Sequence, residues 1–256
     1  MLRIRETHLQ QDREDKRLLD WLVFPELSVH PNDVNSIILP FVRKYRCMVL
    51  AGLVYHTEYS LPGTPLINTA LWLIPEWETS TGLQIRRIEQ GKFNIAVSEK
   101  DLNPNPMPFR PAQWIVKYDW QSNQCRSLNL TASICYDSTD LSLASDLKTR
   151  SDIYAVCALN KDVGTFDRMA ESLHYHLYQG ILIVNNGQFG GSNFYAPFNE
   201  HYHRQVLHLH GQPQAQIAFI EVDPEKFVCR PNDKDLLPHG KWKTPPADWK
   251  IICPGK

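Results

Sequence analysis

Three side chains that together could carry out acyl transfer stand directly after apolar runs of this sequence. They are the carboxylate of Glu26, the ammonium of Lys92 and the thiol of Cys135. Loops that follow the strands of an α/β sheet converge, so we expect the three side chains to meet. There the carboxylate would take the thiol proton, the thiolate would attack a carbonyl carbon, and the ammonium would hold the charge developing on oxygen.

Cys135 lies where a strand-like run ends and a helix-prone run begins. Residues 128–134 alternate apolar and polar positions, whereas residues 138–148 carry leucines at helical spacings. A thiol close to the N-terminus of a helix has a lowered pKa and is more often present as the nucleophilic thiolate. We therefore interpret Cys135 as a nucleophile, while the plain alternative is a buried structural cysteine.

The other two residues also have plain alternatives. Glu26 follows a proline and could be a solvated turn residue. Three other cations near Lys92 in the sequence could hold the charge on oxygen in its place, namely Arg86, Arg87 and Lys100.

The histidines include three His-x-His pairs, at 174/176, 201/203 and 208/210. Residues i and i+2 of a strand share a face, so the second and third pairs could hold a metal ion. No cysteine or acidic residue stands at zinc-finger spacing from them, which favours histidines that face solvent or are hydrogen-bonded. We therefore predict neither a metal nor another cofactor.

Strand-like and helical patterns alternate along the chain. Strands are predicted at 19–27, 47–55, 67–74, 83–89, 115–118, 127–134, 152–159 and 181–184, and a closing hairpin at 205–210 and 216–222. Helices are predicted at 2–20, 32–45 (capped by Asn32 or Asp33), 138–148 and 165–178, with a proline-rich loop at 103–111 and a turn at 185–192. Several strands are apolar on both faces, which indicates an α/β sheet covered by helices.

Composition narrows the class of protein. The 256 residues carry a net charge of −1, which gives no general reason to expect nucleic-acid or membrane binding. No apolar run has the length of a membrane span, and the charged N-terminus does not resemble a signal peptide. The six cysteines form no CxxC pair, so we expect mostly reduced thiols and a cytoplasmic protein.

The composition changes near residue 224 to proline, lysine, aspartate and tryptophan. We therefore predict a domain over residues 1–223 and an extended tail over 224–256. The basic and aromatic residues of this tail are Lys241, Trp242, Lys243, Trp249 and Lys250. They fit either contact with nucleic acid or, as the favoured interpretation, an arm that docks on a partner subunit.

Three short motifs resemble those of the nitrilase, or carbon–nitrogen hydrolase, superfamily. They are Phe-Pro-Glu at 24–26, Lys-Phe-Asn-Ile at 92–95 and Ile-Cys-Tyr-Asp at 134–137, in the family's order. The resemblance covers residues 18–222. It implies a four-layer αββα sandwich, a homo-oligomer paired across a helical face, and a Glu-Lys-Cys triad that hydrolyses small amides, nitriles or carbamoyl groups.

The resemblance also implies a role for each residue. Cys135 would attack and form a thioester, and Glu26 would be the general base for the attack and for the water that follows. Lys92 and the backbone N–H of Tyr136 would stabilise the oxyanion. Glu99 would orient water or the lysine, although a surface capping carboxylate is its plain alternative.

Two asparagines complete the site that the resemblance implies. The segment 185–192 resembles the family's strand-end Asn-x-x-Gly and Gly-x-Ser pieces. We accordingly expect Asn160 and Asn185 on the substrate side.

The sequence departs from the family pattern in two places. The family opens with a strand before its first helix, whereas this chain starts in a charged run, so its first edge strand is predicted to be missing. After Cys-Tyr-Asp the family often has Phe-Pro-Glu, whereas residues 138–143 read Ser-Thr-Asp-Leu-Ser-Leu. These departures leave a non-catalytic scaffold or oligomerisation module as the alternative function.

A narrower resemblance concerns residues 158–169 and 173–177. These stretches look like nitrilase-like domains fused to bacterial reverse transcriptases of antiviral defence systems. The resemblance implies a fused or associated reverse transcriptase as a partner.

Overall fold

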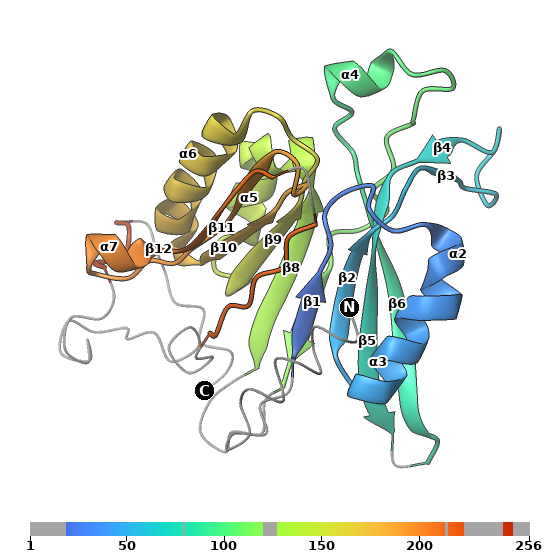
Figure 1. The fold of residues 1–256 in the computed structure, drawn as a ribbon, viewed down its shortest axis with the longest axis horizontal. Helices are drawn as coiled ribbons and strands as arrows, with labels where there is room; N and C mark the ends of the chain where they lie inside the picture. Colours follow the sequence, from blue (N-terminus) through green and yellow to red (C-terminus); the bar gives the residue numbers. More distant parts are fainter. Residues whose placement is uncertain (1–18, 79, 120–126, 213–214, 223–242, 248–256) are drawn as a thin grey trace. The chain divides into compact units, whose positions relative to one another are not determined.

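The computed structural model describes residues 19–78, 80–119, 127–212, 215–222 and 243–247. The chain divides into two compact units, Met1–Pro111 and Ala112–Lys256. In each unit helices pack on one side of a β-sheet (Figure 1). The α/β fold class is therefore confirmed, and each unit supplies one sheet and one helical layer of the kind that an αββα sandwich contains.

The main sheet of the first unit has the strand order β1-β2-β5-β6. Its strands are β1 (Trp21–Val23), β2 (Met48–Gly52), β5 (Thr69–Glu78) and β6 (Gly82–Gly91), and a separate pair joins β3 (His56–Thr57) to β4 (Leu66–Ile67). β1 runs parallel to β2, whereas the other neighbours are antiparallel. Since residues 1–18 lie outside the described residues, the predicted helix at 2–20 and the absence of an earlier edge strand both stay predictions.

The helical layer of the first unit is one segment that changes its helical period. It consists of α2 (Pro31–Asp33), the π-helix η1 (Val34–Ile38) and α3 (Leu39–Tyr45). The prediction that Asn32 or Asp33 caps this segment was wrong, because the ring of His30 accepts a hydrogen bond from the Asn32 N–H. Pro31 follows the cap directly, and its fixed φ suits the first helical position.

The apolar core of the first unit lies between this helical segment and the sheet. Val49 and Ala51 of β2 pack there with Leu73 of β5 and Val42 of α3, and all four are fully buried. Leu50, which points to the other face of β2, is also fully buried. Burial on both faces explains why this strand is a continuous apolar run in the sequence.

The sheet of the second unit has six strands in the order β12-β11-β10-β9-β8-β7. They are β7 (Ile115–Tyr118), β8 (Leu128–Ile134), β9 (Ile153–Cys157), β10 (Gly180–Val184), β11 (Gly190–Tyr195) and β12 (Gln205–His210). The three central strands β8, β9 and β10 run parallel. The outer strands are antiparallel to their neighbours.

Helical elements connect these strands, and α6 packs on β10 and β11 (Figure 1). They are η2 (Cys135–Thr139, 3-10), α5 (Leu141–Leu147), α6 (Val163–Leu173), η3 (His174–Tyr178, π) and α7 (His201–Arg204), while the first unit adds α4 (Val97–Lys100). None of the helices in the described part of the chain has the length and apolar character needed to cross a membrane.

The predicted hairpin of 205–210 with 216–222 was wrong. β12 pairs with β11 instead, and residues 215–222 form no regular structure. β11 begins inside the run that was predicted as a turn, because Gly190 and Gly191 both have φ of +73° and still lead into the strand. A Cβ on Gly191 would lie 2.4 Å from a methyl carbon of Val163, so only glycine allows α6 to pack this closely on the strand.

Candidate functional site

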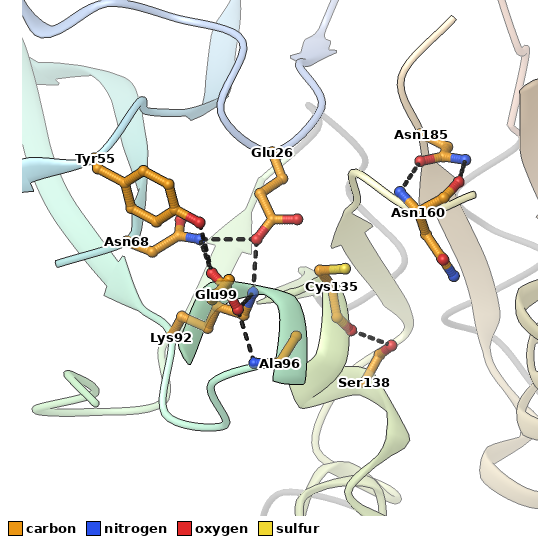
Figure 2. A network of polar contacts seen from close by, with 10 residues as sticks. All are labelled: Glu26, Tyr55, Asn68, Lys92, Ala96, Glu99, Cys135, Ser138, Asn160 and Asn185. Atoms are coloured by element: carbon orange, nitrogen blue, oxygen red, sulfur yellow. Dashed lines mark hydrogen bonds and ion pairs between the residues drawn. The ribbon is translucent and has the colours of Figure 1, made fainter. Parts of the chain in front are cut away.

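Three of the predicted site residues meet inside the first unit (Figure 2). Glu26 lies in the turn after β1, Lys92 follows β6, and Glu99 lies in the short helix α4. Lys92 Nζ is 2.8 Å from Glu26 Oε1 and 2.6 Å from Glu99 Oε2. The lysine is only 1% exposed, so a single buried ammonium bridges two carboxylates. The competing cations Arg86 and Arg87 bind elsewhere, to Glu76 and Asn35.

Two further residues hold the carboxylates, and sequence reasoning missed both. The Asn68 side-chain amide donates to Glu26 Oε1 at 2.7 Å and to Glu99 Oε1 at 3.3 Å. The Tyr55 hydroxyl donates to Glu99 Oε1 at 2.9 Å. Asn68 stands directly before the start of β5, and a polar residue within an apolar run was the one available signal.

Glu99 also caps the turn in which it lies. Its Oε2 accepts a hydrogen bond from the Ala96 backbone N–H at 2.8 Å. The predicted alternative, a capping carboxylate at the surface, is therefore half right, since Glu99 does cap α4 but is buried. The same oxygen accepts from Lys92, so the cap fixes the carboxylate against the lysine.

Two glycines allow the backbone to approach the site. A Cβ on Gly52 would lie 2.1 Å from the Pro25 carbonyl oxygen and 2.7 Å from Glu26 Cα. A Cβ on Gly91, the residue before Lys92, would lie 1.8 Å from the Phe109 carbonyl oxygen. Glu26 and Lys92 thus lie beside strand ends on which only glycine fits.

Burial and charge separate the two carboxylates. Burial raises the pKa of Glu26 above its usual value, against the opposing effect of Lys92. Burial also acts to raise the pKa of Glu99, but hydrogen bonds from Lys92, Ala96 and Tyr55 outweigh it and hold that pKa below its usual value. Glu26 is therefore the carboxylate that is better suited to accept a proton, and Glu99 is the one that stays ionised.

Cys135 lies in the second unit, directly after β8, and is 8% exposed. Its φ is +43°, a left-handed conformation that residues other than glycine seldom adopt. The Ser138 hydroxyl donates to the Cys135 carbonyl oxygen at 2.6 Å and closes the turn (Figure 2). The prediction placed Cys135 at the start of a helix, but it opens the 3-10 turn η2 and the α-helix begins only at Leu141.

The remaining predicted residues also lie in the second unit. Tyr136 follows Cys135 and its side chain is 47% exposed. The Asn185 side chain accepts from the Asn160 N–H at 2.8 Å and donates to the carbonyl oxygens of Asn160 and Gly190 (Figure 2). The Asn185 amide therefore joins the loops after β9 and β10.

The histidine pairs are placed differently from one another. His201 and His203 lie on the short helix α7, so they do not share the face of a strand. His208 and His210 lie on β12, and His208 Nε2 is 3.1 Å from Asp167 Oδ2. Within the described residues, no three His, Cys, Asp or Glu side chains are grouped as metal ligands.

Comparison with known proteins gave matches only to solved structures, since no family model and none of the curated proteins matches this sequence. Nit3 from Saccharomyces cerevisiae, of branch 10 of the nitrilase superfamily, matches with a TM-score of 0.57 at 13% identity, over 80% of this chain and 76% of that chain. XC1258 from Xanthomonas campestris, a CN-hydrolase superfamily protein, matches with a TM-score of 0.53 at 10% identity, over 82% and 81%. The chain has the nitrilase fold.

A third structure with the nitrilase fold is an amidase of Nesterenkonia sp. AN1. One of its variants matches with a TM-score of 0.54 at 12% identity, over 82% of this chain and 80% of that chain. In another variant of that amidase, the acetamide moiety of fluoroacetamide is covalently added at the active-site cysteine. Both matches cover most of each chain, so the nitrilase fold extends over the two units.

Proposed function

We propose that this chain hydrolyses the carbon–nitrogen bond of small amides or nitriles, with Cys135 as the nucleophile. The buried Glu26–Lys92–Glu99 network supports this most strongly, because two carboxylates with pKa values shifted in opposite directions flank one ammonium. The left-handed turn at Cys135 and the nitrilase fold of the chain are consistent with it. Carboxylates with pKa values shifted in this way gather at functional sites.

The first half of the reaction forms a thioester. Glu26 takes the Cys135 proton, the sulfur bonds to the amide carbon, and the carbonyl π electrons move to oxygen. Lys92 and the Tyr136 N–H stabilise that oxyanion. When it collapses, the carbon–nitrogen bond breaks, and Glu26 returns its proton to the leaving ammonia or amine.

The second half consumes one water. Glu26 takes a proton from water, the hydroxide oxygen bonds to the thioester carbon, and the carbon–sulfur bond breaks. Glu26 passes that proton to the released sulfur. The products are a carboxylic acid and the Cys135 thiol, so the enzyme returns to its starting state. Glu99 transfers no proton in this scheme, since its lowered pKa keeps it ionised beside Lys92.

Ammonia release from a panel of small amides and nitriles tests the proposal. We expect Cys135→Ala to abolish release and Cys157→Ala to retain it; Cys157 is the matched control, since it is also a buried cysteine at a strand end. Labelling with iodoacetamide, followed by intact mass, tests the reactivity of the thiol without the need to know the substrate. If Cys135 is labelled at the same rate in wild type, Glu26→Gln and Lys92→Met, then neither Glu26 nor Lys92 activates its thiol and the proposed triad is refuted.

We also propose that the chain forms a homo-oligomer and associates with a reverse transcriptase. The stretches at 158–169 and 173–177 support this second proposal, and they form most of α6 and η3. Light scattering after size-exclusion chromatography tests the homo-oligomer, and co-purification with the reverse transcriptase tests the partner. If the chain is only a scaffold, Cys135→Ala will leave both the assembly and any defence phenotype unchanged.

A further inference from the structure

A cavity of about 190 Å³ lies in the second unit, where α6 and η3 meet β11 and α7. His174 and Tyr195 form its buried wall, while Glu171, His201 and Arg204 also line it. None of the residues predicted from the sequence for catalysis is among its lining residues. The nitrile or amide chemistry proposed above therefore gives this cavity no role.

His174 is the most unusual group in the cavity wall. It is 3% exposed, and neither ring nitrogen has a hydrogen-bond partner among the described residues. Burial, assisted by the charges of Lys243 and Arg204, lowers its pKa to about 4, against the opposing effect of the nearby backbone carbonyls of Glu171 and Ala170. The ring is consequently neutral at neutral pH, with one nitrogen that donates and one that accepts. Leaving both unsatisfied is costly, so a ligand that pairs with them gains affinity.

Two cations, Arg204 and Lys243, act on His174, while two carboxylates, Glu171 and Asp167, act on Tyr195. Arg204 donates to the carbonyl oxygens of Phe198 and Asn199. These bonds use two of its five N–H donors and hold the guanidinium group in place. Lys243 Nζ lies 4.0 Å from the Tyr175 ring centroid, and burial together with the charge of Arg204 lowers the pKa of this lysine.

Within the part of the chain that the structure describes, no carboxylate forms an ion pair with Arg204 or Lys243. Among the lining residues Glu171 is the one carboxylate and Arg204 the one arginine, whereas Lys243 is not a lining residue. A ligand carboxylate would therefore supply the anion that the two cations lack, and a ligand hydroxyl could donate to Glu171 or pair with His174.

We propose that this cavity binds a small 2-hydroxycarboxylate, with its carboxylate against Arg204 and its hydroxyl against His174 and Tyr195. The volume supports a ligand of this size. At a share of about 30 Å³ per water, the cavity holds about six waters, which is the space of about six non-hydrogen atoms. It is smaller than the roughly 300 Å³ at which pockets for drug-sized ligands begin.

Binding of sodium lactate to the full chain, followed by NMR titration, tests the proposal. Lactamide is the neutral probe of the same shape, and lactate and lactamide are compared on Cys135→Ala, in which the proposed reaction cannot convert the amide to lactate. We expect saturable binding of lactate and at least about tenfold weaker binding of lactamide, because the amide lacks the charge that meets Arg204. Arg204→Gln and His174→Phe should each weaken lactate binding by about tenfold or more. Arg168→Gln, which changes an exposed arginine of α6, should bind as wild type does.

Cys135→Ala should also bind lactate as wild type does, which separates this cavity from the proposed catalytic cysteine. Equal binding of lactate and lactamide, or no saturable binding of lactate, would overturn the proposal. If Arg204→Gln and His174→Phe do not fold, the ring signals of His174 in wild type decide the matter. Signals that lactate leaves unmoved at saturation would also overturn it.

Discussion

The substitution Asn68→Asp would keep the shape of a buried side chain but place a third carboxyl group in the network. The amide nitrogen of Asn68 lies 2.7 Å from Glu26 Oε1 and 3.3 Å from Glu99 Oε1. In its ionised form the new group would face both carboxylates, with Lys92 as the cation they already share. A buried charge without its own partner costs about 3–5 kcal/mol. That is a large fraction of the roughly 5–15 kcal/mol that stabilises a typical domain.

The pH dependence separates this charge effect from simple loss of hydrogen bonds. Burial and the like charges of Glu26 and Glu99 will raise the pKa of the new carboxyl group, so it is neutral at low pH. Its destabilising effect therefore appears as pH rises through that raised pKa. Asn68→Leu removes the same two hydrogen bonds and adds no charge, so it is the matched control.

Urea unfolding of both variants at about pH 5 and about pH 8 measures the difference. We expect Asn68→Asp to be less stable than Asn68→Leu by about 3 kcal/mol or more at the higher pH. The gap should shrink at the lower pH, where the new group can donate a hydrogen bond to Glu26. Equal stability of the two variants at the higher pH would refute the view that Asn68 lies between two ionised carboxylates.

Three other predictions follow from the same unit. Because the pKa of Glu26 is raised, ammonia release should fall as pH drops through a midpoint above 4.5, and Glu26→Gln should abolish release at every pH. Gly52→Ala puts a Cβ 2.1 Å from the Pro25 carbonyl oxygen, so we expect the free energy of unfolding to fall by about 3 kcal/mol or more. Its control is Gly164→Ala, whose Cβ would meet nothing closer than 4.0 Å and which should keep the melting temperature or raise it. Tyr55→Phe removes one hydrogen bond to Glu99 and should cost about 1–3 kcal/mol in urea unfolding.

The fold was predictable where one strong local pattern decided it. The strand 115–118 was predicted with its observed bounds, because a short apolar run stands between loop residues. Predictions failed where backbone conformation overrode composition. Gly190 and Gly191 read as a turn, yet they begin β11. Glycine is required there because the backbone of Gly211 lies against Gly190 and Val163 lies against Gly191. The short helix α7 was not predicted, since a four-residue helix has too few positions to show a period.

The candidate site was only partly predictable for a similar reason. Glu26, Lys92 and Glu99 stand in recognisable motifs, so their meeting in one network could be expected. The hydrogen bonds of Asn68 and Tyr55 to Glu99 could not be expected. The two residues stand 31 and 44 positions before Glu99, and contacts over such separations leave no local pattern in the sequence. Such partners become visible only after pairing of β5 with β6 has fixed which residues face each other.

The left-handed backbone at Cys135 has a consequence for how this position would change under selection. A residue with a Cβ in that region costs of order 1–3 kcal/mol, whereas glycine adopts the same φ without penalty. Selection for stability alone would therefore favour glycine after β8. We therefore expect Cys135→Gly to relieve this strain and, if the proposed function holds, to leave the protein without activity.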